Sequence, residues 1–389
     1  MLVLFLLPFP AAAQNFPELG SRAAVVMDAA TGTIVFTKNP DEEIPPASLT
    51  KLMTMHLTFM EMEAGRASLD EIITPSREGW AVNQPPLSSL MGLAAGHSVS
   101  LRDLLLGMAI FSGNDAATAT ALRFAPSLSD FAEKMNREAA SLGLRKTHFV
   151  DASGYSEENM TTAREFAEFC RIYIEAHPYS LRDYHSVMEF AYPRPNNLPE
   201  QYRANPGTRL RRNSNTLLGR VEGVDGLKTG FIFESGYNIA LTGERNGTRF
   251  IVVILGGPSE WQGDRIRDED AERLINWAFA NYKTIRPRFA SIEPFRVWKG
   301  KTNYVGIVPG EPLDFTALIE RGEYMGGTLE MQEPLIAPLP AGIPVGSLVL
   351  YDTLGELRRI PMLTAGEVER GGFFKRLFDS IRLFFRRRA

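Results

Sequence analysis

Three short motifs in this sequence place hydroxyl and amine groups at spacings that suit acyl transfer. The first, Pro46-Ala47-Ser48-Leu49-Thr50-Lys51, precedes a helical period. Residues three apart at a helix start share a face, so the Ser48 hydroxyl can meet the Lys51 amine. A serine hydroxyl needs a base to become a good nucleophile, and a lysine in a dry, cationic site loses pKa and can be that base. About 0.5 Ser-x-x-Lys matches are expected by chance, so a simple helix N-cap at Ser48 stays open.

The second motif is Ser112-Gly113-Asn114-Asp115, at the end of the apolar stretch Leu104–Phe111. About 0.9 Ser-x-Asn matches are expected by chance. Ser, Gly, Asn and Asp are also the usual residues of an ordinary turn. Alone, this motif therefore does not separate a site from a turn.

The third motif, Lys228-Thr229-Gly230, is the most specific, with about 0.05 matches expected by chance. On a strand, Lys228 and Gly230 face one way and Thr229 the other. Glycine at that position lets a substrate backbone, or the edge of a partner chain, approach closely. The alternative is a strand end that carries a surface lysine.

The elements that must position these motifs alternate along residues 22–283. Helical periods and strand-like runs both occur there, and Asn246-Gly247 within residues 240–255 predicts the turn of an antiparallel hairpin. The helical periods cover Ser48–Glu63, Leu101–Phe124, Leu128–Leu142, Thr162–Ala176 and Asp268–Tyr282, and the strand-like runs cover Ala23–Met27, Thr33–Phe36, Asn238–Thr242 and Phe250–Leu255. After Pro287, short alternating runs separated by Gly and Pro predict a separate small β domain.

Composition excludes several classes of protein. The 389 residues are 44% hydrophobic and 23% charged, which is typical of a folded chain of two to three domains. A net charge of −4 argues against nucleic-acid binding by bulk attraction. Cys170 is the single cysteine, so no intrachain disulfide can form. With five scattered histidines and no His-Glu-x-x-His, we expect neither a metal nor a cofactor.

The N-terminal run Leu2–Pro10 is apolar and is followed by Ala11-Ala12-Ala13-Gln14. Small residues before Gln14 fit a secretory cleavage site, so residues 1–13 are predicted to be a signal peptide. Nine apolar residues are too few to span a bilayer, which needs about 20. A short buried strand is the alternative.

The C-terminal segment 373–389 combines aromatic side chains with positive charge. Large apolar residues recur at helical spacing, and six basic residues face a single acid, Asp379. Such a cationic amphipathic helix suits the plane of an anionic membrane surface. We therefore expect residues 371–389 to attach the protein to a membrane; a helix docked on its own protein is the alternative.

The three motifs together are a far more specific signal than any one of them alone. Their expected numbers multiply to about 0.02, and the required order lowers the chance to roughly a few in a thousand. This ordered trio is the signature of serine acyl-transfer enzymes of the penicillin-binding and β-lactamase superfamily, which the chain resembles.

Further runs resemble one branch of that superfamily, the low-molecular-mass D-alanyl-D-alanine carboxypeptidases similar to penicillin-binding protein 5. These runs are Phe149–Gly154, Asn213-Ser214-Asn215, Gly236-Tyr237-Asn238, Gly256-Gly257 and Leu274–Phe279. The resemblance implies an α+β fold: a β-lactamase/transpeptidase-like domain with an antiparallel sheet flanked by helices and a helical subdomain, then a small all-β domain and a terminal amphipathic helix. The expected ranges are 14–283, 284–366 and 367–389.

The resemblance also implies residue roles. Ser48 attacks the carbonyl between the two terminal D-alanines of a peptidoglycan stem peptide, and Lys51 is its general base. Ser112, hydrogen-bonded between Lys51 and Lys228, relays a proton to the leaving D-alanine, and Asn114 holds the substrate amide.

On the motif strand, Lys228 supplies positive potential and Thr229 binds the terminal carboxylate, with Gly230 beside them. The backbone N–H groups of Ser48 and Phe231 form the oxyanion hole, and Arg267 can reach the substrate carboxylate. The resemblance further implies that β-lactam antibiotics acylate Ser48 as substrate mimics.

Two residues depart from the pattern of relatives. Phe231 stands where some relatives have His or another polar residue, and Ser214 stands where a close relative has arginine. Alternative functions with the same acylation chemistry are a β-lactamase and a crosslinking transpeptidase; a third is a non-catalytic cell-wall scaffold. The expected location is the periplasmic face of the cytoplasmic membrane, with peripheral attachment by the terminal helix.

Overall fold

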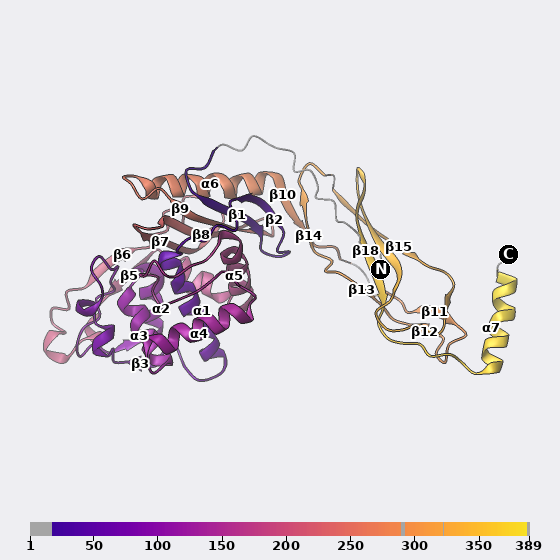
Figure 1. The fold of residues 1–389 in the computed structure, drawn as a ribbon, viewed down its shortest axis with the longest axis horizontal. Helices are drawn as coiled ribbons and strands as arrows, with labels where there is room; N and C mark the ends of the chain where they lie inside the picture. Colours follow the sequence, from indigo (N-terminus) through magenta and orange to yellow (C-terminus); the bar gives the residue numbers. More distant parts are fainter. Residues whose placement is uncertain (1–17, 289–291, 322, 387–389) are drawn as a thin grey trace. The chain divides into compact units, whose positions relative to one another are not determined.

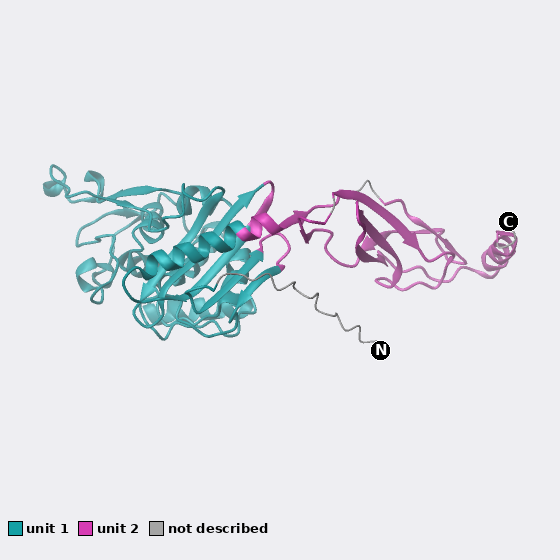
Figure 2. Ribbon diagram, turned by 90° about the horizontal axis from the view of Figure 1, so that it is seen from above, with its two compact units in different colours: residues 1–27, 34–245, 250–276 teal, residues 28–33, 246–249, 277–389 magenta. Residues whose placement is uncertain are grey.

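The computed structural model describes residues 18–288, 292–321 and 323–386. They form two compact units, each assembled from separate stretches of the chain (Figure 2). Unit 1 contains residues 34–245 and 250–276 together with the N-terminal stretch up to Met27, and unit 2 contains residues 28–33, 246–249 and 277–389. The predicted signal peptide at 1–13 lies outside the described residues. Because the units interleave in sequence, the boundary at 283/284 stays a prediction.

A five-stranded sheet forms the centre of unit 1, with strand order β2-β1-β9-β8-β7. Its strands are β1 (Ala23–Asp28), β2 (Ile34–Lys38), β7 (Val224–Ile232), β8 (Gly236–Arg245) and β9 (Thr248–Gly257). The predicted hairpin is confirmed, because Asn246 and Gly247 adopt φ of 51° and 76° between the neighbouring strands β8 and β9. The middle strands are buried on both faces, as their continuous apolar runs require.

Helices cover both faces of this sheet. Figure 1 shows α6 along one face and the α1–α4 group on the other. The helices are α1 (Lys51–Glu63), α2 (Leu101–Ile110), α3 (Asn114–Phe124), α4 (Leu128–Ser141), α5 (Ala163–Ala176) and α6 (Gly263–Asn281). Single turns of helix occur at η1 (Ala47–Thr50), η2 (Arg77–Gly79), η3 (Ala81–Asn83), η4 (Leu181–His185), η5 (Pro195–Asn197) and η6 (Glu200–Tyr202). Short strand pairs are β3 (Ile72–Ile73) with β4 (Val99–Ser100), and β5 (Glu189–Tyr192) with β6 (Arg209–Arg212).

One predicted helix is wrong in a way that concerns the site. The period over Leu101–Phe124 is divided into α2 and α3, because Ser112 takes a left-handed φ of 55° and Gly113 is extended. The apolar spacing continues through this break, which is why the pattern alone does not reveal it. The break places Asn114 at the start of α3.

Unit 2 is built mainly from short strands around its own apolar core. The sheets are ordered β13-β18-β17-β15, β12-β11-β16 and β10-β14. The strands are β10 (Tyr282–Ile285), β11 (Phe295–Trp298), β12 (Tyr304–Val305), β13 (Ile307–Pro309), β14 (Phe315–Leu318), β15 (Tyr324–Met331), β16 (Leu335–Ile336), β17 (Pro344–Asp352) and β18 (Gly355–Thr364). The core of buried side chains includes Leu350, Ile360 and Met362, which have no exposed surface.

The C-terminal helix α7 (Phe373–Arg386) keeps its apolar side chains in solvent. Seven of them are 47–73% exposed: Phe373, Phe374, Leu377, Phe378, Ile381, Phe384 and Phe385. Its one acid, Asp379, is buried and accepts hydrogen bonds from the Lys299 backbone N–H and the Lys375 amine, both at 2.7 Å. Asp379 therefore ties α7 to the loop after β11.

Candidate active site

Ser48 and Lys51 meet at the turn that leads into α1. Ala47, immediately before Ser48, has a left-handed φ of 51°, a conformation costly for a residue with a Cβ and one that persists only where surrounding structure imposes it. The buried Lys51 Nζ lies 2.9 Å from Ser48 Oγ, 2.7 Å from Asn114 Oδ1 and 2.6 Å from the Ser153 carbonyl oxygen. The predicted contact between the serine hydroxyl and the lysine amine is thus present in the structure.

These three contacts define which proton can move. The Asn114 Oδ1 and Ser153 carbonyl oxygens can only accept, so they take two N–H groups of Lys51. In the neutral amine the remaining lone pair is left for the Ser48 hydroxyl, which then donates. Burial lowers the pKa of Lys51 to about 7, although the charges of Asp151 and Asp115 oppose that shift. A neutral amine is therefore accessible near neutral pH.

Asp151 holds the loop that supplies the Ser153 carbonyl. Its carboxylate accepts hydrogen bonds from the backbone N–H groups of Ser153 and Gly154 at 2.7 Å and of Ser156 at 2.9 Å. Burial alone would raise the pKa of Asp151, but these bonds and one from Asn159 outweigh it and leave that pKa below its usual value. The Asp151 carboxylate therefore fixes the loop in the conformation that places the Ser153 carbonyl oxygen against Lys51.

Asn114 and Ser112 lie at the break between α2 and α3. The Asn114 side chain joins Lys51 to a second hydroxyl, since its Nδ2 donates to Ser88 Oγ at 3.0 Å. Ser112 is mostly buried at the break. Among the described residues, however, Ser112 forms no hydrogen bond to either lysine, in contrast to the predicted bridge between Lys51 and Lys228. Lys228 Nζ instead donates to the Thr229 carbonyl oxygen at 2.8 Å.

Strand β7 brings the third motif against the first. A Cβ on Gly230 would lie 2.9 Å from Ser48 N and 3.0 Å from the Pro46 carbonyl oxygen, so only glycine permits this approach. Lys228 is buried, and burial together with the charges of Lys51 and Arg267 holds its pKa well below the usual value. An arriving carboxylate would raise that pKa again and favour the cation.

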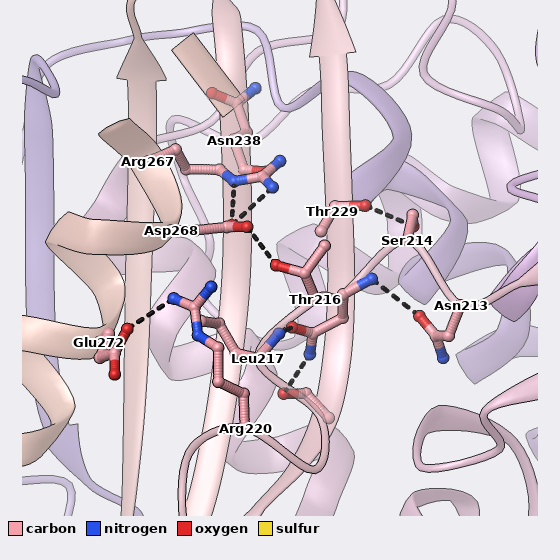
Figure 3. Close-up of polar contacts among 12 residues, drawn as sticks. Asn213, Ser214, Thr216, Leu217, Arg220, Thr229, Asn238, Arg267, Asp268 and Glu272 are labelled. Atoms are coloured by element: carbon pink, nitrogen blue, oxygen red, sulfur yellow. Dashed lines mark hydrogen bonds and ion pairs between the residues drawn. The ribbon is translucent and has the colours of Figure 1, made fainter. Parts of the chain in front are cut away.

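The side chains beside β7 are shown in Figure 3. Thr229 Oγ1 and Ser214 Oγ share a hydrogen bond of 2.6 Å, so Ser214 contacts the motif directly. Arg267 is buried on α6 and donates from Nε and a terminal nitrogen to its neighbour Asp268, at 2.9 and 2.6 Å. Asp268 also accepts from Thr216. The guanidinium predicted to reach a substrate is therefore engaged by a carboxylate.

Phe231 continues β7 into an aromatic cluster. Its ring lies 4.3 Å from that of Tyr237, its cross-strand partner on β8, and 5.2 Å from that of Phe233. The Arg267 guanidinium lies 5.7 Å from the Tyr237 ring. The aromatic side chain is thus held by its neighbours on the sheet. Within the described ranges no group of three or more His, Cys, Asp or Glu side chains could hold a metal ion.

Comparison with known proteins assigns the chain to a family. The sequence profile described as D-alanyl-D-alanine carboxypeptidase matches residues 10–259, and that of the penicillin-binding protein 5 C-terminal domain matches residues 282–370. The chain belongs to the D-alanyl-D-alanine carboxypeptidase family. The D-alanyl-D-alanine carboxypeptidase DacC of Escherichia coli is 33% identical over 95% of this chain and 89% of its own length.

Solved structures of penicillin-binding proteins share the fold of this chain. Penicillin-binding protein 5 of Haemophilus influenzae superposes with a TM-score of 0.76 at 27% identity, covering 91% of this chain and 99% of that one. Penicillin-binding protein D2 of Listeria monocytogenes in its cefotaxime-bound form gives a TM-score of 0.58 at 30% identity, covering 68% and 98%. The predicted fold class and the predicted activity are confirmed: the protein is a D-alanyl-D-alanine carboxypeptidase, a cell-wall hydrolase of the penicillin-binding protein family.

Two supporting carboxylates had no role in the sequence analysis. Asp151 caps the loop at Ser153, and Asp115 accepts the backbone N–H groups of residues 91–93 at 2.7 to 2.9 Å. Both stand in Asp-containing turn patterns, Asp151-Ala152-Ser153-Gly154 and Gly113-Asn114-Asp115. Such patterns indicate a local carboxylate cap, although they do not identify the loop that is capped.

Proposed function

We propose that this carboxypeptidase removes the terminal D-alanine of peptidoglycan pentapeptides through an acyl-enzyme on Ser48. The observation that carries the proposal is the buried Lys51 amine, whose two other partners are acceptors and whose third contact is Ser48 Oγ. A base with a pKa near the working pH is best suited to take a proton in the transition state. Lys51 has that pKa because it is buried.

In the proposed reaction, Ser48 Oγ bonds to the carbonyl carbon between the two D-alanines while its proton passes to Lys51. The oxyanion accepts hydrogen bonds from the Ser48 and Phe231 backbone N–H groups, each such donor typically contributing about 3 kcal/mol. The C–N bond then breaks, and the leaving amine takes the proton held by Lys51, relayed by Ser112, whose hydrogen bond to Lys51 has to form in the substrate complex. Water hydrolyses the Ser48 ester and restores the hydroxyl.

The substrate is held by groups on either side of this serine. The Asn114 amide binds the peptide group, and Thr229, backed by Ser214, binds the terminal carboxylate. The substrate carboxylate raises the lowered pKa of Lys228 and so favours its cation. Arg267 on α6 adds positive potential, although Asp268 engages its guanidinium. Gly230 leaves room for the substrate backbone beside β7.

The test is mass spectrometry of the protein with benzylpenicillin, beside an assay of D-alanine release from a pentapeptide ending in D-Ala-D-Ala. We expect a penicilloyl adduct that peptide mapping locates on Ser48, together with D-alanine release. An adduct without release would support a transpeptidase or a scaffold, and rapid penicillin hydrolysis would support a β-lactamase. Absence of any adduct would contradict the Ser48 mechanism.

We also propose that α7 attaches the enzyme to the outer surface of the cytoplasmic membrane. Its exposed aromatic face and its basic residues support insertion among anionic headgroups. Among the described residues, no helix has both the length and the hydropathy needed to cross a membrane.

Deleting residues 371–389 should abolish sedimentation with vesicles that contain anionic phospholipid. The truncated protein should still release D-alanine from a soluble pentapeptide, since the deletion removes none of the proposed site residues. A control variant, Ser380→Ala, should sediment like the full chain. Undiminished sedimentation of the truncated protein would disprove attachment by α7.

A further inference from the structure

A cavity of about 390 Å³ lies beside the β5–β6 hairpin of unit 1, away from the motif residues. Its lining comes from two segments: Ala94, Ala95 and His97 on one side, and the 193–207 part of the connection between β5 and β6 on the other. Tyr202 and Asn205 contribute an aromatic ring and an amide to otherwise largely apolar walls. Small-molecule sites commonly have this composition.

Hydrogen bonds join the two segments that line the cavity. Asn197 donates from its side chain to the Ser98 carbonyl oxygen at 3.1 Å, and Ser98 N donates back to the Asn197 carbonyl oxygen at 2.9 Å. Thr208 Oγ1 donates to the Pro193 carbonyl oxygen at 2.6 Å and closes the connection at its base. Both walls are therefore fixed to each other.

The adjoining strand, β6, carries two arginines that form no ion pair with a described residue. All four residues of β6 are exposed; Arg212 pairs with Glu189, whereas within the described part of the chain no carboxylate pairs with Arg209 or Arg211. Arg209 and Arg211 share a face, because side chains alternate along a strand. Their cross-strand partners are Tyr192 and Phe190, and Phe190 packs on Phe111, the residue before Ser112.

The two chain segments that line the cavity also lead to residues that contact the active site. The 88–97 segment carries Ser88, which accepts from Asn114, and Gly92, against which the Arg209 guanidinium lies. Strand β6 runs directly into Ser214, which contacts Thr229. The cavity thus shares chain segments 88–97 and 193–214 with groups that contact Asn114 and Thr229.

We propose that Arg209, Arg211 and this cavity form a subsite for the sugar-linked end of an acidic stem peptide. The inference rests on the proposed function and extends it to a larger substrate. Stem peptides carry free carboxylates along their length and an amino sugar on their first residue. Four residues separate that sugar from the scissile bond, a reach of about 13 to 14 Å. The arginines match the carboxylates in charge, and Tyr202 offers a ring face to the sugar.

The experiment compares kcat/KM for D-alanine release from three substrates. The first is an N-acylated tripeptide ending in D-Ala-D-Ala with no charge other than its terminal carboxylate, the second is the pentapeptide with its further carboxylates, and the third is the same pentapeptide bearing N-acetylmuramic acid. Arg209→Ala with Arg211→Ala should lower kcat/KM for both acidic substrates about tenfold and leave the tripeptide unchanged. Ala95→Trp, which fills the cavity, should lower kcat/KM only for the sugar-bearing substrate. Arg212→Ala, on the opposite face and already paired with Glu189, is the matched control.

Added salt should reduce the wild-type preference for the acidic substrates and leave that of the double variant unaffected, because exposed charges are screened. Equal effects of the double variant on all three substrates would overturn the subsite, as would a muramyl preference that survives Ala95→Trp. Failure of the wild-type enzyme to release D-alanine from any of the three would overturn the Ser48 reaction, and the subsite with it.

Discussion

Replacing Lys51 with methionine should lower D-alanine release by a factor of about 10³ or more, at the upper part of the range for loss of a general base. Methionine fills the same buried volume but has no lone pair for the Ser48 proton. The measurement is kcat/KM for D-alanine release, together with the rate of penicilloyl-adduct formation. Lys51→Arg separates the base from its charge: it stays cationic and cannot deprotonate, so it should be as inactive as methionine. Substantial activity in Lys51→Arg would contradict the role of Lys51 as base.

The pKa of Lys51 gives this prediction a pH signature. Since the neutral amine is the active form, kcat/KM of the wild-type enzyme should rise with pH and level off above about 7. Stability should depend on pH in the same direction. Between the folded pKa of about 7 and the ordinary lysine pKa of 10.5, the unfolded chain binds more protons, so the stability of the wild-type protein should increase with pH across that window. Thermal unfolding of Lys51→Met across the same pH range should show a smaller increase, because only Lys228, whose pKa is also lowered by burial, still contributes one.

Substituting alanine for Gly154 should destabilise the fold by about 3 kcal/mol or more and lower acylation about a hundredfold. A Cβ at Gly154 would lie 1.8 Å from the Ala47 carbonyl oxygen, which is backbone and cannot rotate away. The residue also has a φ of +80°. Either the 151–156 loop or the turn before Ser48 must move, and the Ser153 carbonyl then leaves Lys51.

The matched control for that variant is Gly143→Ala. Gly143 has nearly the same φ, +78°, but nothing lies within 4 Å of a Cβ there. It should therefore show only the cost of a left-handed alanine, about 1 to 2 kcal/mol, and normal acylation. Chemical denaturation and the rate of penicilloyl-adduct formation measure the two effects. Equal losses in both variants would show that contact with Ala47 is unimportant.

Local chemistry made much of the site predictable. The three-residue spacing of Ser48 and Lys51 places both at one helix start, and Asn246-Gly247 specifies its hairpin with no help from the rest of the chain. Lys228 lies on a strand, as the third motif suggests. These features depend on periods and turn residues that neighbouring positions determine.

Features that depend on distant contacts were not predictable. The helix break at Ser112 interrupts a continuous apolar pattern because the following residues contact segments elsewhere in sequence, such as Ser88 and Lys51. Similarly, the sequence shows that Arg267 precedes Asp268, but it does not show that the two side chains are hydrogen-bonded to each other. The partners of Lys51 come from three separate segments, so their combination appears only in the folded chain.

The bond between Asp379 and the Lys299 backbone has a thermodynamic consequence for the proposed attachment of α7 to a membrane. A peptide that folds only when it meets a bilayer loses part of its binding free energy to the entropy of ordering its backbone. In the structure α7 is helical and is tied to its own unit through Asp379. Its helical content should therefore be the same with and without vesicles, and the burial of its aromatic face can contribute almost entirely to affinity.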